Sequence, residues 1–199
     1  MTHPKKLTAV LTLLLAGALT LASCGDDDGS PDARDDTSTA RFNDADVRFA
    51  QEMIPHHEQA VVMAEMAESH AERAEVKELA AGIEAAQGPE IETMSQWLED
   101  WGQDPATDGM GHGDMGHGTS SEMPGMMDQD DLADLDGAMG GDWDQMFLTM
   151  MIEHHEGAIE MARTEQADGE NPDAVALAEQ IESDQTAEIA VMEGLLDAR

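Results

Sequence analysis

The sequence predicts an all-α fold, an antiparallel four-helix bundle made of two duplicated helical hairpins. A pattern around His56 returns 98 positions later around His154, and matched apolar residues continue along both copies without a gap. Apolar residues recur at helical spacing in both copies, and the alternating pattern of strands is missing. Because neither hairpin could bury its apolar stripe alone, we expect the two halves to pack about a pseudo-twofold axis.

The first predicted helix covers residues 44 to about 70, and Asn43 or Asp44 can cap its first turn. Pro55 lies inside this helix. Because proline removes one backbone hydrogen bond and clashes with the preceding turn, we expect a kink near Gln51, or a short helix that ends there. The second copy has Glu153 at the matching position, so no kink is expected in it.

Three more helices follow in the prediction. The second covers residues 75 to about 99 and is weakened by internal glycines and a proline, and the third covers residues 142 to about 166. A stop and restart comes next, where Asn171 can cap a helix that has Pro172 at its favoured first position. The fourth helix then runs to about residue 196.

The N-terminus predicts export. Two lysines precede an apolar run over residues 7–21, and small residues lead to Cys24, the only cysteine. This order is typical of a secretory signal rather than a spanning helix. Cys24 stands where the cleavage site of bacterial lipoproteins would have it, so residues 1–23 are the predicted signal peptide and Cys24 the lipidation site. An ordinary signal peptide that contains a cysteine is the alternative. We expect an extracytoplasmic protein, lipid-anchored to the bacterial cell membrane.

Charge excludes some partners. The chain has 44 Asp and Glu against 9 Lys and Arg, for a formal net charge of −35. Nucleic acid and anionic headgroups would be repelled, so membrane contact is expected only through the N-terminal lipid. The acidity itself also fits a solvated surface in a saline habitat. Residues 24–41, rich in Asp, Gly, Ser and Thr, are predicted to be a disordered tether before the bundle domain of residues 42–199.

Residues 103–141 separate a first repeat (42–102) from a second (142–199) and differ from both in composition. We interpret them as a flexible arm that carries metal ligands, because glycine between the ligands offers nothing to pack. Thioethers hold Cu(I) without deprotonation, whereas zinc rarely accepts them. The predicted secondary ligands are Met110, His112, Met115, His117, Met123, Met126 and Met127.

Each repeat carries two adjacent histidines between two methionines, and at about 100° per residue these side chains share one helix face. If the pseudo-twofold axis brings the two helices together, imidazoles and thioethers converge to form one or two low-coordinate copper sites. Glu58 and Glu156 are candidate second-shell acceptors for the histidines, or merely solvated. The predicted copper ligands, for Cu(I), Cu(II) or both, are Met53, His56, His57, Met63, Met151, His154, His155 and Met161.

The two motifs, Met-Ile-Pro-His-His-Glu and Met-Ile-Glu-His-His-Glu, resemble the signature of the bacterial domain-of-unknown-function family 305, a ferritin-like group. The likeness covers residues 42–199. It implies a secreted or membrane-anchored helical bundle with a role in copper binding for the ligands above. Glu153 in place of proline leaves the two sites open to being unequal. Ferritin chemistry is not implied, because the Glu-x-x-His spacing of di-iron bundles does not occur in this sequence.

We therefore predict a copper-binding protein, not an enzyme, that sequesters, buffers or hands on copper. One alternative is a copper or iron oxidoreductase that uses the histidine cluster, although the sequence offers no evident acid, base or substrate pocket. Another is a metal-free interaction module on the cell surface. The sequence leaves open whether two copies pair as a homodimer.

Overall fold

The computed structural model describes residues 41–104 and 123–198. Within these ranges the chain is helical and contains no strand, so the all-α prediction is confirmed. The predicted signal peptide, Cys24 and nearly all of the tether lie outside the described residues, as do Met110, His112, Met115 and His117. The helices are α1 (Asp44–Glu65), α2 (Ala67–His70), α3 (Ala74–Asp100), α4 (Gln129–Gly137), α5 (Gly141–Asp168) and α6 (Pro172–Asp197).

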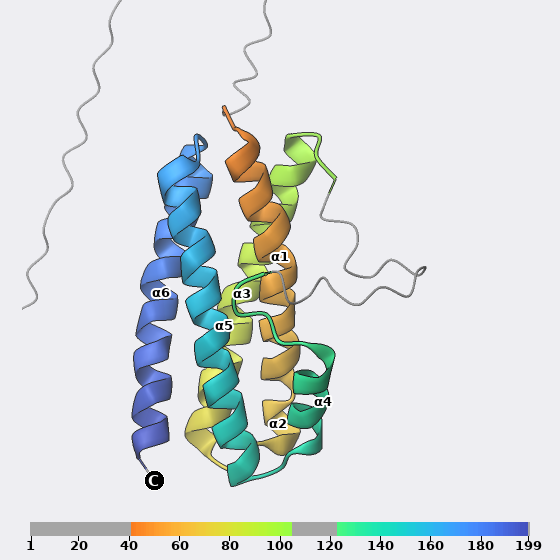
Figure 1. Cartoon of the computed structure of the whole chain (residues 1–199), viewed down its shortest axis with the longest axis vertical. Coiled ribbons are helices and arrows are strands. Elements are labelled where there is room, and N and C mark those ends of the chain that lie inside the picture. Colours follow the sequence, from red (N-terminus) through yellow and green to blue (C-terminus); the bar gives the residue numbers. More distant parts are fainter. Residues whose placement is uncertain (1–40, 105–122, 199) are drawn as a thin grey trace, which may run out of the picture. The chain divides into compact units, whose positions relative to one another are not determined.

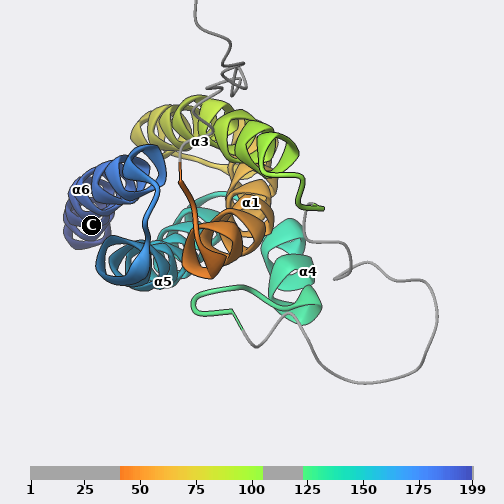
Figure 2. The ribbon, with the colours of Figure 1, turned by 90° about the horizontal axis from the view of Figure 1, so that it is seen from above.

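Four long helices, α1, α3, α5 and α6, lie side by side (Figure 1). Helices α1 and α3 pair as one hairpin, α5 and α6 pair as the other, and the hairpins meet mainly where α1 packs on α5. Seen from above, the short helix α4 lies outside this group, beside α1 (Figure 2). The two hairpins predicted from the repeat are therefore present, whereas the ferritin-like relationship stays a prediction.

The ends of the helices follow the capping residues. Asn43 is the N-cap of α1 and forms a capping box with Asp46, and Asn171 caps α6 directly before Pro172. Helix α1 continues through Pro55, so the predicted alternative of a helix ending near Gln51 is wrong. Side chains before and after the proline are buried, and their packing outweighs the loss of one backbone hydrogen bond.

The prediction of a flexible arm over residues 103–141 is wrong in its second part. Asp128 caps α4 through a capping box with Asp131, and Leu135 of this helix is fully buried. Met127, just before the cap, is buried as well. The apolar pattern around Leu135 is too short to predict a helix, because glycines and acidic residues surround it in the sequence.

Two aspartates join the hairpins at opposite ends. Asp46 at the start of α1 accepts hydrogen bonds from the backbone N–H groups of residues 170 and 171, which connect α5 to α6. Asp144 at the start of α5 accepts from residues 72 and 73, which connect α2 to α3. The repeat of 98 residues relates Asp46 to Asp144, and it also relates residues 72 and 73 to residues 170 and 171. Each hairpin thus binds the loop of the other, which makes α1 and α5 antiparallel and fixes their register.

The charge of these two aspartates is balanced differently. At one end, the Arg73 guanidinium lies 3.5 Å from the Asp144 carboxylate. At the other, Asp46 is beside Glu165, which is buried. Burial, a hydrogen bond to Asp46 and repulsion from Asp46 and Asp168 raise the pKa of Glu165 to about 8. A proton on Glu165 therefore reduces the negative charge beside Asp46, as the positive charge of Arg73 does beside Asp144.

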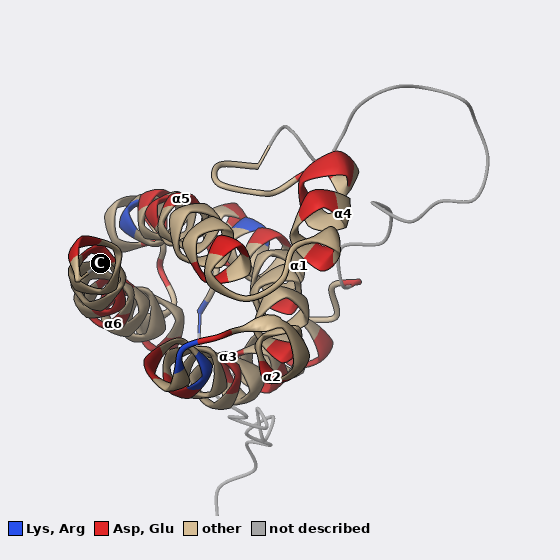
Figure 3. Cartoon of the chain, turned by 90° about the horizontal axis from the view of Figure 1, so that it is seen from below, with Lys and Arg blue, Asp and Glu red and all other residues tan. Residues whose placement is uncertain are grey.

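Asp and Glu are spread over the helices, and Lys and Arg are few (Figure 3). No helix in residues 41–104 or 123–198 is both long and apolar enough to cross a membrane.

A Glu165→Gln variant should change how stability depends on pH. Because the folded state holds a proton on Glu165 up to about pH 8 and the unfolded state loses it near the ordinary value of 4.5, the wild-type free energy of unfolding should fall as pH rises through this window. The slope from this group is at most about 1.4 kcal/mol per pH unit. Glutamine keeps a hydrogen-bond donor without the charge, so this slope should vanish in urea unfolding at pH 5 to 9. The exposed Glu160→Gln change on the same helix should leave it intact, and parallel curves for wild type and Glu165→Gln would contradict the assignment.

Candidate metal centre

The four histidines of the two motifs lie in the core between the hairpins. His56 and His57 from α1 and His154 and His155 from α5 all have 0% exposure. The rings of His56 and His154 meet across the interface, with centroids 3.8 Å apart and planes tilted by 41°. The residues that the repeat relates to each other are therefore in contact at the middle of the α1–α5 pair.

The four methionines of the motifs separate into two pairs. Met53 and Met161 belong to the apolar cluster on one side of the histidines, and Met63 and Met151 belong to the cluster on the other side. This pairing follows from the antiparallel packing, because a residue before the histidines on one helix faces a residue after them on the other. The predicted ligands thus form three layers, with imidazoles between two pairs of thioethers.

Burial keeps two of the imidazoles neutral. Desolvation, followed by repulsion from neighbouring histidines, lowers the pKa of His56 to about 3, although the hydrogen bond to Pro124 acts in the opposite direction. Desolvation and the same kind of repulsion from the three other histidines hold the pKa of His154 well below its ordinary value. Neutral imidazole is the form that binds metal ions, so neither ring must lose a proton first.

Hydrogen bonds fix the proton on three rings. His57 Nε2 donates to Glu90 (2.8 Å), His155 Nε2 donates to Glu188 (2.7 Å), and His56 Nε2 donates to the carbonyl oxygen of Pro124 (3.0 Å). A carbonyl or carboxylate oxygen accepts here, so Nε2 carries a proton, and the neutral form of each ring then has its lone pair on Nδ1. The Nδ1 atoms of these three histidines and both nitrogens of His154 are buried with no hydrogen-bond partner.

Unpaired nitrogens in a core cost free energy that a bound ion could recover. Among the residues described by the structure, no three His, Cys, Asp or Glu side chains are grouped as a metal ion would require. A cage of imidazoles and carboxylates is therefore not formed there. The donors that this part of the chain offers to an ion are imidazole nitrogens together with the thioethers above and below them.

The acceptors for the histidines differ from those that the sequence suggested. Glu58 and Glu156 are exposed, and Glu90 on α3 and Glu188 on α6 take this place. Each lies 33 residues after its histidine, on the neighbouring helix of the hairpin. The signal was available, because Glu90 and Glu188 are themselves related by the repeat, but helical spacing alone points to neighbours on the same helix.

Two further polar residues adjoin this layer and were missed. Gln87 and Gln185, also related by the repeat, lie one turn before Glu90 and Glu188, and both are 3% exposed. Both amide atoms of Gln87 and the amide oxygen of Gln185 have no partner. Buried polar groups thus extend from the α1–α5 interface toward α3 and α6.

A short segment of residues 123–127, which we call the strap, covers His56 on the side of the layer away from α3 and α6. Besides the bond from His56 to Pro124, the Gln59 side chain holds the strap at both amide atoms: its Nε2 donates to the Met127 carbonyl (2.9 Å), and its Oε1 accepts from the Met127 N–H (2.8 Å). Met123 and Met126 in the strap are half-buried. Of the predicted arm ligands, Met127 thus packs in the same apolar cluster as Met63 and Met151, and Met123 and Met126 belong to the segment whose Pro124 carbonyl contacts His56.

The strap approaches α5 closely. Gly125 has a φ of +75°, a backbone conformation that favours glycine, and it packs against Gly157 on α5. A Cβ atom on residue 157 would collide with the Pro124 carbonyl. Positions 59 and 157 are equivalent in the repeat, yet one supplies an amide that holds the strap and the other supplies space for it. The strap therefore breaks the symmetry of the two halves.

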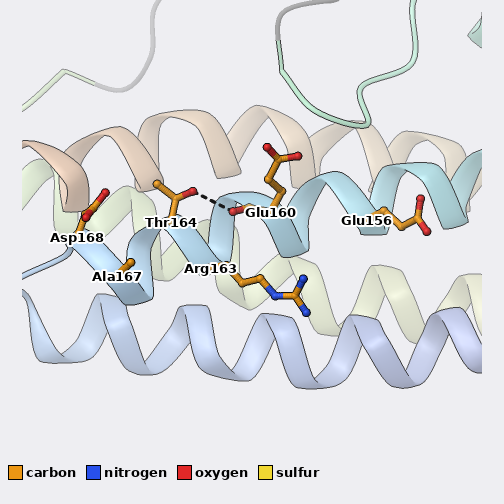
Figure 4. A pocket seen from close by; sticks show the side chains of 6 residues that line it. All are labelled: Glu156, Glu160, Arg163, Thr164, Ala167 and Asp168. Carbon is orange, nitrogen blue, oxygen red and sulfur yellow. Dashed lines mark hydrogen bonds between the residues drawn. The ribbon is translucent and has the colours of Figure 1, made fainter.

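A shallow hollow on the surface of α5 does not reach this centre (Figure 4). None of the four buried histidines contributes to its wall. It is lined by Glu156, Glu160, Arg163, Thr164, Ala167 and Asp168.

The fold and the site define a helical protein with a duplicated, buried layer of histidines and methionines. The chain belongs to the family described as "Domain of unknown function (DUF305)", whose model matches residues 46–196. A comparison with curated proteins finds no match.

Several solved structures are similar to this chain. CopM in its Cu(II)-bound form is 36% identical, with 76% of this chain and 95% of that chain covered and a TM-score of 0.64. A DUF305 fragment from Deinococcus radiodurans is 30% identical over 79% and 98% of the two chains, with a TM-score of 0.68. A DUF305 protein from Streptomyces coelicolor is 29% identical over 77% and 92%, with a TM-score of 0.66. CopM has also been solved in Cu(I)-bound and Ag-bound forms.

A Gly157→Ala variant should displace the strap, because the added methyl group has no room beside Pro124. The helix itself should gain stability, since alanine is favoured over glycine in a helix by about 1 kcal/mol. We expect faster hydrogen exchange at the Met127 amide, which Gln59 protects in the wild type. The matched control is Gly194→Ala on α6, where a Cβ atom would meet nothing within 4 Å. Equal protection of Met127 in both variants would show that the close approach does not hold the strap.

Proposed function

We propose that this protein binds copper in the layer between α1 and α5 and sequesters, buffers or hands on the metal outside the cytoplasm. The observation that carries the proposal is the set of four buried imidazoles with unpaired nitrogens, placed between two pairs of buried thioethers. Copper is the cargo of this site. The proposed ligands are His56, His57, His154 and His155 with Met53, Met63, Met151 and Met161.

The chemistry of the donors favours a soft ion. Imidazole and thioether are neutral ligands, and thioether selects Cu(I) over hard cations. Structural zinc sites instead use four ligands from thiolate, imidazole and carboxylate, whereas the two motifs here place two pairs of buried thioethers beside the imidazoles. CopM, a relative with this fold, has been solved with copper and with silver, which supports the choice of a soft metal.

We propose binding without catalysis. The histidines are fully buried and covered by the strap, so a substrate would have no access to a metal ion held there. An ion could enter where the strap moves. The half-buried Met123 and Met126 in the strap are then the first thioethers that it would meet.

The proposed location is the outer side of the cell membrane, with Cys24 as the lipidated residue. The order of basic, apolar and small residues before Cys24 supports it. The relative from Streptomyces coelicolor is described as a secreted protein, which also supports a location outside the cytoplasm.

The first test is copper loading of the purified protein. We expect Cu(I) to be retained after desalting and to raise the melting temperature, because it binds only the folded state; at 100 times the dissociation constant the gain is about 2.7 kcal/mol. Changing all four histidines to alanine should abolish the rise in melting temperature and lower the number of Cu(I) ions retained, and His70→Ala, outside the layer, should do neither. Should the fourfold variant fail to fold by circular dichroism, the pair His56→Gln and His154→Gln replaces it. Retention that is equal in wild type and histidine variants, or equal for Mg²⁺, would reject the site.

The second test addresses the thioethers. Replacing Met63 and Met151 by leucine conserves volume and should cost little stability, less than about 1.5 kcal/mol per site. We expect Cu(I) affinity to fall by about tenfold or more, equivalent to ~1.4 kcal/mol. The matched control is Met94→Leu with Met192→Leu, a buried pair that is also related by the repeat but is not part of either motif. If both pairs lower Cu(I) affinity equally, the methionines act only through packing.

A further inference from the structure

The two hydrogen bonds from histidine to glutamate are the most faithfully repeated polar contacts of the site. His57 binds Glu90 at 2.8 Å and His155 binds Glu188 at 2.7 Å, in each case from the first long helix of a hairpin to the second. The carboxylates are 18% and 24% exposed, whereas the rings that they hold are fully buried.

Other contacts of the layer are not repeated. His56 donates to the strap, but the equivalent Nε2 of His154 has no partner. Position 55 is proline in one half and glutamate in the other, and positions 59 and 157 differ as well. The two halves have thus diverged around the histidines while each kept a carboxylate on the same ring nitrogen.

Such a carboxylate controls which nitrogen can bind a metal ion. While Glu90 accepts the Nε2 proton of His57, the neutral, metal-binding form of the ring has its lone pair on Nδ1, which is buried and unpaired. Without an acceptor, the ring could carry its proton on Nδ1, and it could also rotate. The negative charge of a carboxylate hydrogen-bonded to the outer nitrogen also makes the inner nitrogen a stronger electron donor.

We propose that Glu90 and Glu188 are positioning residues that make Nδ1 of His57 and of His155 the copper-binding atoms. This inference rests on the proposed function and assigns the ligand atom for two of its histidines. The same carboxylates favour Cu(II) over Cu(I), because nearby negative charge stabilises the more highly charged ion.

The first experiment uses metal-free protein and reads the tautomer of each ring from ¹⁵N chemical shifts. Wild type should show His57 and His155 with the proton on Nε2. The double variant Glu90→Ala with Glu188→Ala should populate the form protonated on Nδ1. Glu90→Gln with Glu188→Gln should keep the wild-type tautomer, because an amide oxygen still accepts. If the alanine variant shows the wild-type tautomer, the carboxylates do not position these rings.

The second experiment adds copper. Loss of an outer hydrogen-bond partner typically lowers metal affinity by about 10- to 100-fold, so the alanine variant should lose that much Cu(I) affinity in competition with a chromophoric chelator. The glutamine variant should lose less affinity but should have a more positive Cu(II)/Cu(I) potential in voltammetry. The matched control, Glu58→Gln with Glu156→Gln, removes the same charge from exposed positions next to the same histidines, and should stay within twofold of wild type.

The outcomes separate the two ideas. Wild-type copper binding with unchanged affinity and potential in the Glu90 and Glu188 variants would overturn the positioning role and leave the proposed function standing. A wild type that binds no copper would reject the proposed function and, with it, copper positioning by these glutamates. Should the alanine variant fail to fold, the potential of the glutamine variant decides.

Discussion

The structure depends on the contact between α1 and α5 at their buried histidines. Imidazoles in a core destabilise the fold unless their polar atoms find partners. Here the rings of His56 and His154 meet at 3.8 Å, and their neighbours His57 and His155 reach outward to glutamates on α3 and α6. One polar layer therefore involves all four long helices, and it divides the apolar core into two clusters.

The register of this contact is fixed far from the histidines. Asp46 and Asp144 each bind the backbone of the loop in the opposite hairpin, so the two hairpins are joined at both ends. The histidine pairs are close to the middle of the antiparallel helices between these two anchors, and they therefore meet at the same height. An aspartate at a helix start here serves the other hairpin as well as its own helix.

Duplication provides two equivalent halves, and later differences have made them unequal. A proton on Glu165 balances one anchor, and Arg73 balances the other. Gln59 holds the strap, whereas Gly157 makes room for it. In the described part of the chain, the result is a site whose donors repeat in both halves and whose cover, the strap, does not.

The sequence by itself determined the repeat, the helices and the shared face of the histidines and methionines, because helical period fixes which side chains lie together on one helix. It did not determine Glu90 and Glu188 as partners, the pairing of Met53 with Met161, the continuity of α1 through Pro55 or the docking of the strap. These features depend on which distant segments pack against that face. Spacing along one helix does not contain this information, because it arises only when antiparallel hairpins and their connecting segment are brought together in the core.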